Sequence, residues 1–273
     1  MLTAENKPRQ LGVTQEAERR ETRLAHVLKS YGPAVLLVLL AIGIWELLCR
    51  VLDVPDYLWP TPSLIVTTLV DNAGDLASDT WVTLREVIYG FLIAVAAGLG
   101  IGTALHLSRV LRRAVYPILI ASQSIPTVVL APVLVLLMGF GIGPKLAIIA
   151  LFCFFPIVVN TVDGLGSVDR EYIRMMLTLD GTRWSIFRRI EFPSALPLIF
   201  SGTRIAATYA AIGAIFGEWA GSEAGLGFTM LQAQGRLDTP LVFAAVLIVT
   251  LIAVALFLLV TLIERLTIPW AKT

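Results

Sequence analysis

The sequence predicts an all-α integral membrane protein with about six transmembrane helices. Of its 273 residues, 57% are hydrophobic and only 15% are charged, whereas soluble domains are ~45–50% apolar and ~25% charged. The apolar residues form continuous runs of about 20 residues, the length that crosses a bilayer as a helix. They do not alternate with polar residues as they would in a membrane barrel. We therefore expect the lipid bilayer to surround the chain.

Each apolar run is expected to form one transmembrane helix. The fourth run is the shortest, and the third contains Pro117, Pro126 and Pro132, which favour a break in its helix. Residues 1–30 are expected to form a polar tail, and residues 31–273 the transmembrane domain. The six expected spans are Pro33–Leu52, Val87–Leu107, Val115–Met138, Leu146–Val162, Leu196–Trp219 and Leu241–Ile263.

The distribution of Lys and Arg predicts the orientation of the chain. Basic residues are concentrated in the tail and in the connections after spans two and four, whereas the connection after span one is acidic. Because basic residues in short connections stay on the cytoplasmic side, we expect residues 164–192 to be cytoplasmic and residues 53–84 to lie outside. Both termini are then cytoplasmic, as in a multi-pass protein of the bacterial plasma (inner) membrane. The first apolar run lacks a small-residue cleavage site, so no cleaved signal peptide is expected.

Candidate ligands for metals and nucleotides are sparse. His26 and His106 have no cysteine or carboxylate at ligand spacing, so no metal site is expected. Cys49 and Cys153 lie inside expected spans, where thiols usually serve as small packing residues. The sequence contains neither a clustered nucleophile nor paired carboxylates near an expected membrane face, so it does not predict an enzyme. The net charge of +1 gives no basis for binding nucleic acid.

The stretch "GFGIGPK", Gly139–Lys145, is only superficially similar to a phosphate-binding loop. Pro144 stands where that motif requires glycine, and no Ser or Thr follows the lysine. A short extracellular turn explains the stretch better. We therefore expect no nucleotide and no cofactor to be bound by this chain.

A few charged residues fall within the expected spans. Glu46 and Arg50 are four residues apart in the favourable order for a helical pair, which serves either structure or solute contact. Arg204 is expected to extend its long side chain back to the membrane surface. Glu218 and Trp219, at the end of span five, are expected to anchor the helix at the interface.

Polar residues interrupt the third span beside Pro126. They are Gln123, Ser124 and Thr127. Such groups either line a pathway through the membrane or form hydrogen bonds between helices. The sequence leaves both roles open.

A basic, aromatic segment, "RWSIFRRIE", connects spans four and five. From Thr182 as N-cap, helical spacing places Trp184, Phe187 and Ile190 on one side of a short helix, with arginines interspersed, and Pro193 is expected to end it. Such an amphipathic helix either lies on lipid headgroups or docks into another protein.

This connection, Glu171–Gly202, resembles the cytoplasmic coupling loop of permease subunits from ATP-binding-cassette (ABC) importers. The loop's pattern is Glu-Ala-Ala, three residues, Gly, nine residues, then Ile-x-Leu-Pro. The sequence matches its end at "IEFP", but "RMM" replaces Glu-Ala-Ala, and Asp180 stands at the Gly with Gly181 one place late.

The resemblance extends over nearly the whole chain after residue 30. The stretches "IWELLCRVLDVPDYLWPTPSLIVTTL", "SQSIPTVVLAPVLVLLMGFGIGPKLA" and "IFGEWAGSEAGLGFTML" are similar to the branch that serves sulfonates, taurine, nitrate and thiamine-pyrimidine precursors. Within it, "FPSALPLIFSGTRIAATYAAIGAIFGEW" is most similar to thiamine-precursor and riboflavin importers.

The resemblance implies a homodimeric permease that works with two cytoplasmic ATPase subunits, which hold ATP and Mg, and with an extracytoplasmic solute-binding protein. It implies a coupling loop over about residues 164–195. A self-contained secondary transporter is the alternative, although that class favours mirrored interruptions in two halves of the chain. The residues implied to contact the ATPase are Asp180, Gly181, Arg183, Trp184, Phe187, Arg188, Arg189, Ile190 and Pro193.

Overall fold

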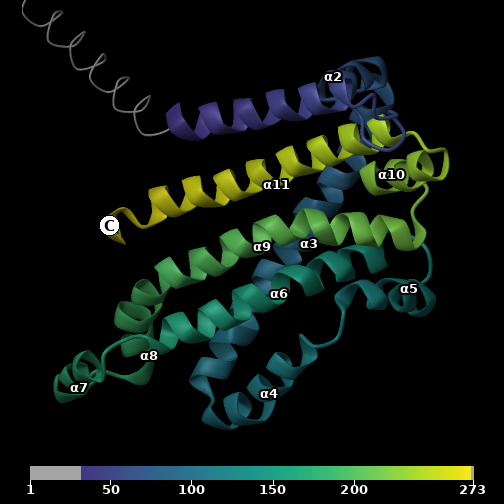
Figure 1. The fold of residues 1–273 in the computed structure, drawn as a ribbon. Helices are drawn as coiled ribbons and strands as arrows, with labels where there is room; N and C mark the ends of the chain where they lie inside the picture. The colour runs from purple at the N-terminus through teal and green to yellow at the C-terminus, as the bar shows by residue number, and fades with distance from the viewer. Residues whose placement is uncertain (1–31, 272–273) are drawn as a thin grey trace, which may run out of the picture. The chain divides into compact units, whose positions relative to one another are not determined.

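The computed structural model in Figure 1 describes residues 32–271. The polar tail expected over residues 1–30 lies outside this range. Between residues 32 and 271 the regular structure is helical throughout, without a strand. Five of the helices are long and apolar enough to cross a membrane, or six if one bent pair counts as a single span. This confirms the predicted fold class.

The chain divides into two compact units, Met1–Leu64 and Ile65–Thr273. The described part of the first unit contains the apolar helix Gly32–Val51, and α2 (Pro62–Asp71) begins in it. Arg50 lies 2.6 Å from the Glu46 carboxylate, which also accepts a hydrogen bond of 3.0 Å from the Ser63 backbone N–H. The expected Glu46–Arg50 pair is thus confirmed, and it holds the start of α2.

The second unit is built around three long helices. They are α3 (Ala73–Leu107), α6 (Ile142–Gly166) and α9 (Phe192–Gly221), and α6 packs along both of the others. α11 (Thr239–Thr267) packs against α9 and the short α10 (Leu226–Gly235) (Figure 1). The buried side chains of α3, α6 and α9 form the core of this unit.

Glycines allow these three helices to approach closely. A Cβ added to Gly98 on α3 would lie 2.6 Å from the Cγ2 atom of Ile157, and one added to Gly202 on α9 would lie 2.5 Å from the carbonyl oxygen of Pro156. Small residues at such contacts maximise van der Waals packing where lipid supplies no hydrophobic driving force. Cys153 is buried beside these contacts, and Cys49 and Cys153 are both free thiols, as expected.

The expected third span is two helices rather than one. α4 (Arg109–Ser122) and α5 (Thr127–Met138) are bent by 102° relative to each other. Pro126 directly precedes α5, lacks a backbone N–H and disfavours helical geometry in Ile125. Of the three prolines expected to interrupt the span, only this one lies at the break.

The connection from α6 to α9 contains α7 (Arg170–Thr178) and α8 (Arg183–Ile186), followed by a π-helical turn (Phe187–Glu191). The last described residues, Pro269–Ala271, form a 3₁₀ turn. α9 and α11 are joined by an ion pair of 2.8 Å between Arg204 and Glu264. Arg204 thus pairs with a carboxylate on the neighbouring helix, and its expected extension to the membrane surface stays a prediction.

Candidate functional site

The helix α7 presents an apolar face without a partner in the described chain. Asp169 caps its start, accepting a hydrogen bond of 2.9 Å from the Glu171 N–H. Tyr172, Met175 and Leu179 follow at helical spacing, and all three are exposed. The predicted amphipathic helix begins later, at Thr182, so α7 was not predicted, although the spacing of these three residues was a readable signal.

The turn after α7 explains the two residues that depart from the family pattern. Asp180 has a φ of +56°, a left-handed conformation in which Asp is tolerated better than most side chains. The Gly181 N–H donates to the Met176 carbonyl at 2.8 Å, and a Cβ on Gly181 would lie 2.5 Å from that oxygen. The left-handed conformation is therefore adopted by Asp180, and the close packing that requires glycine falls on the next residue, Gly181.

The helix that follows does not end at Pro193. Thr182 is the N-cap, as expected, and accepts a hydrogen bond of 3.2 Å from the Ser185 N–H. The helix then runs through the π turn, where the Phe192 N–H donates to the Phe187 carbonyl five residues back, and continues to Gly221. Pro193 lies in the first turn of α9. In a regular α-helix the proline ring would crowd the carbonyl four residues back. The wider π turn before Pro193 gives the ring more room.

The expected docking aromatics lie in different environments. Trp184 is 63% exposed, whereas Phe187 is 8% exposed and packs against the core residues Leu165, Ala195 and Ile199. The two rings stack with centroids 5.5 Å apart. Trp184 is therefore the aromatic residue available to a partner, and Phe187 fastens the segment to the core.

The other residues implied to contact an ATPase surround this aromatic pair. Arg188 and Arg189 are exposed, and Ile190 is half-buried. Arg183 is exposed and lies 3.9 Å from the carboxylate of the buried Glu191. Glu191 also lies 3.1 Å from His106 Nε2 on α3. This end of the unit thus presents arginines and apolar side chains together.

A cavity of about 670 Å³ lies beside the bend between α4 and α5. Gln123 and Thr127, on either side of the bend, line it together with Asn160 on α6 and Tyr209 on α9. Ser124 is exposed but does not line it. Two of the three predicted pathway residues are thus brought together, with three polar residues that were not predicted, Ser122, Asn160 and Tyr209.

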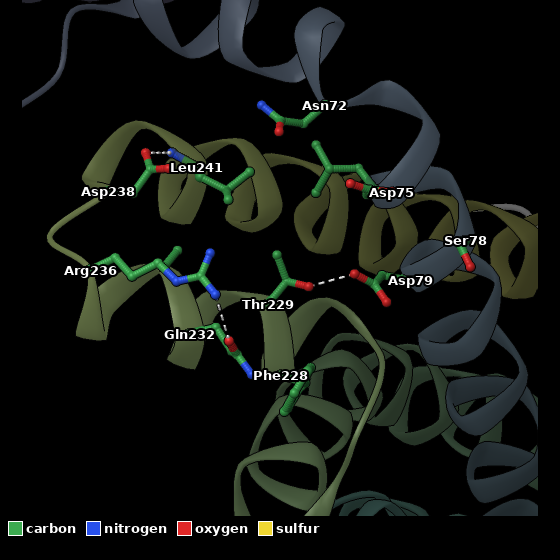
Figure 2. Close-up of a pocket in the computed structure, with 12 residues that line it drawn as sticks. Asn72, Asp75, Ser78, Asp79, Phe228, Thr229, Gln232, Arg236, Asp238 and Leu241 are labelled. Atoms are coloured by element: carbon green, nitrogen blue, oxygen red, sulfur yellow. Dashed lines mark hydrogen bonds between the residues drawn. The ribbon is translucent and has the colours of Figure 1, made fainter.

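A second, more polar cavity of about 400 Å³ lies between the start of α3, α10 and the start of α11 (Figure 2). We call it the acidic groove. Asp79 points toward Thr229, whose hydroxyl donates to it at 2.5 Å, and Asp79 also accepts a hydrogen bond of 3.0 Å from the Gly225 N–H. Asp75 lines the groove too. Asp79 therefore joins the groove to the start of α10.

Buried charges lie next to this groove. The Lys145 ammonium donates to Glu86 and to the Ser222 hydroxyl, each at 2.7 Å. Glu218 is 1% exposed and accepts hydrogen bonds from Thr83 at 2.6 Å and from the Gly227 N–H at 2.5 Å.

The expectation that Glu218 is an interfacial anchor is therefore wrong, because the carboxylate caps the N-terminus of α10, where its charge is favourable. Trp219 is partly exposed and donates to the Gly227 carbonyl at 2.9 Å. Lys145 lies within α6 rather than in a turn, although Gly139 and Gly141 do have positive φ values of 78° and 139°. In residues 32–271 no group of three or more His, Cys, Asp or Glu side chains is arranged to hold a metal ion.

Apolar helices around a cavity lined by neutral polar groups are the arrangement expected of the membrane subunit of a transporter. A family model described as "Binding-protein-dependent transport system inner membrane component" matches residues 94–269. The chain belongs to this family, which comprises the permease subunits of ABC importers. This decides between the two classes of transporter that the sequence left open.

Named relatives agree with this assignment, and a solved structure shares the fold. The chain is 37% identical over 238 residues to the formylaminopyrimidine transport permease protein ThiX of Halalkalibacterium halodurans, covering 87% of this chain and 95% of that protein. It is 35% identical over 240 residues to the riboflavin transport system permease protein RibX of Chloroflexus aurantiacus, covering 87% and 89%. The putative aliphatic sulfonates transport permease protein SsuC of Bacillus subtilis is 28% identical over 249 residues, covering 90% of each. An inward-facing structure of the MetNI methionine ABC transporter shares the fold, with a TM-score of 0.61 at 18% identity, over 71% of this chain and 97% of that chain.

Proposed function

We propose that two copies of this chain form the membrane pathway of a bacterial importer for a small nitrogen heterocycle, driven by separate ATPase subunits that hold ATP and Mg. The observation that supports this proposal is the exposed apolar face of α7, which lies beside exposed arginines. A surface of this kind fits docking of a protein partner. The solute class is supported by the relatives named for formylaminopyrimidine and riboflavin, at 37% and 35% identity, against 28% for the relative named for sulfonates.

The ATPase contact combines α7 with the segment after it. Tyr172 and Met175 supply apolar contacts, Trp184 supplies an aromatic anchor, and Arg188 and Arg189 meet acidic groups at the rim. The Phe187 side chain holds the segment against α9, so force on the contact passes into the membrane helix. Asp180, Gly181 and Pro193 shape the backbone on either side of the contact, and Arg183 and Ile190 complete its border.

The orientation of the chain follows from its charges. Arg170, Arg174 and the arginines of residues 183–189 place α7 and its neighbours on the cytoplasmic side of the inner membrane, and both termini lie on that side. The acidic groove then faces outward. Its three carboxylates, Asp75, Asp79 and Asp238, outnumber the one arginine that lines it, Arg236, so it suits docking of basic side chains of an extracytoplasmic solute-binding protein.

Co-purification with the ATPase tests the proposal. A Tyr172→Ala/Met175→Ala variant removes the apolar face of α7 and is expected to reduce ATPase recovery at least about tenfold, since interface anchors contribute about 2 kcal/mol or more each. Leu177→Ala is the matched control, because this exposed leucine lies on another side of α7. Unchanged ATPase recovery in the double variant, with the protein still folded, contradicts the contact. Solute uptake by the chain without any ATPase contradicts the proposed function itself.

A further inference from the structure

We infer that the cavity beside the α4–α5 bend is a solute-binding site of the permease itself, selective for uncharged solutes with a flat ring and against anionic solutes. The inference rests on the proposed function, because it assigns the solute contacts of that pathway. It adds selectivity within the membrane subunit to any selectivity of a binding protein.

Five neutral polar side chains converge on the cavity from four helices, and one of them, Ser122 at the end of α4, donates its hydroxyl to the Leu119 carbonyl at 2.7 Å. Gln123 follows the last residue of α4, Thr127 is the first residue of α5, Asn160 lies on α6 and Tyr209 lies on α9. The bend of 102° turns α5 away from α4, and the residues on both sides of it face the same space. Separate elements thus supply polar groups to one cavity, as in sites that orient a small molecule.

Several of these polar groups have hydrogen-bonding capacity left. The Asn160 amide donates to the Pro156 carbonyl at 2.8 Å, which fixes the side chain and leaves its own oxygen free to accept. Within residues 32–271, the Gln123 amide and the hydroxyls of Thr127 and Tyr209 have no hydrogen-bond partner in the structure. The cavity therefore offers both donors and acceptors to a solute.

Aromatic rings form much of the cavity wall. Phe152, Phe155 and Tyr209 all line it. The Phe152 ring stacks on Phe216, with centroids 6.0 Å apart and planes 7° from parallel, so a second ring holds it in place. A flat heterocycle can stack on such surfaces while its edge forms hydrogen bonds. The volume of about 670 Å³ falls within the range of small-molecule sites.

Among residues 32–271, no charged side chain lines the cavity. A sulfonate or carboxylate entering it would lose water without gaining a cationic partner, and this desolvation is costly in a low-dielectric site. An uncharged ring with polar substituents instead satisfies the amides and hydroxyls described above. The lining therefore selects by charge.

Lipid is a poor occupant for the same cavity. Hydrocarbon chains satisfy no polar group, so they would leave the free groups of Gln123, Thr127 and Tyr209 unpaired within the membrane. A polar solute removes that cost.

Cysteine labelling of the full-length chain in lipid nanodiscs tests the site. Thr127→Cys introduces a thiol of nearly the same size, and it is treated with two methanethiosulfonates of similar size, one bearing a neutral hydroxyethyl group and one an anionic sulfonatoethyl group. Ser167→Cys, exposed at the end of α6, gives the intrinsic ratio of the two rates. The natural chain gives the background from Cys49 and Cys153. We expect the neutral reagent to be favoured at position 127 by at least about tenfold beyond the ratio at position 167.

Protection by solutes completes the test. Riboflavin or formylaminopyrimidine is expected to slow neutral labelling at position 127 but not at position 167, and ethanesulfonate is expected to slow neither. Equal normalised rates for the two reagents overturn the inference. So does neutral labelling that neither heterocycle slows, because the cavity is then filled by lipid. Labelling by neither reagent until the chain is unfolded overturns it too, because a second copy then covers the cavity. The assay uses no ATPase, so its failure is distinct from failure of the proposed coupling.

Discussion

Lys145 belongs to a buried ion pair, and substituting it alone is expected to destabilise the permease strongly. Lys145→Met removes the ammonium that bonds Glu86 at 2.7 Å and Ser222 at 2.7 Å, and it leaves the buried Glu86 carboxylate without that partner. Removing one member of a buried ion pair costs about 3–5 kcal/mol, because the other charge stays buried. Lys145→Met/Glu86→Gln removes both charges and is expected to lose much less, leaving a coupling energy of at least about 2 kcal/mol between the two sites.

The free energy of unfolding is measured by titrating the full chain in detergent micelles with sodium dodecyl sulfate and following tryptophan fluorescence. The matched control is the exposed pair of Arg50 and Glu46, in which the arginine side chain is 66% exposed. Arg50→Met is expected to cost no more than about 0.5 kcal/mol, as for other exposed helical pairs. If Lys145→Met is no less stable than the double variant, the pair does not hold α3 to α6 and the reasoning fails.

Three further pairs of substitutions test other parts of the structure. Phe187→Ala is expected to lower the free energy of unfolding by about 3–5 kcal/mol because it empties a core position. Trp184→Ala is expected to change it little because Trp184 is exposed. Equal losses in the same titration contradict the assignment of one aromatic to the core and the other to the surface. Asp180 has a φ of +56°, so Asp180→Gly is expected to be tolerated, and Asp180→Val is expected to lower the free energy of unfolding by about 1–2 kcal/mol. A valine variant that unfolds at the same temperature as the natural chain refutes the left-handed turn. Cysteine at Ser167 is expected to resist an impermeant thiol reagent in intact cells while cysteine at Ala77 reacts, and the reverse pattern inverts the proposed orientation.

Long apolar runs were sufficient to predict the membrane helices, but not where the charged residues beside them lie. The expected spans began at Val87 and Leu146, so Glu86 and Lys145 fell just outside them, whereas both residues lie within helices and pair across 59 positions. A hydropathy rule ends a span at a charge, and a partner on a distant helix cannot be read from the sequence. Opposite charges directly adjoining two apolar runs were the available signal.

The candidate site was predicted in part for a similar reason. Gln123 and Thr127 stood out because they interrupt an apolar run, and they line the cavity. Asn160 and Tyr209 were passed over because nothing in the sequence sets them apart from the other polar residues of α6 and α9, and only packing reveals that they face the same space. The extent of the helix containing Trp184 was mispredicted because Pro193 was taken as its end, whereas a π turn lets the helix continue.

That continuity makes the helix Arg183–Gly221 a mechanical lever. Its 39 residues span about 58 Å at the rise of a regular α-helix. One end carries Trp184, and the other carries the Glu218 carboxylate that holds the start of α10. If the rod pivots as a rigid body at its arginine-rich end, a tilt of about 5° moves the far end by about 5 Å. A displacement of that size exceeds the length of any hydrogen bond at Glu218. A small rotation at one end of this helix therefore becomes a displacement of about 5 Å where α9 meets α10.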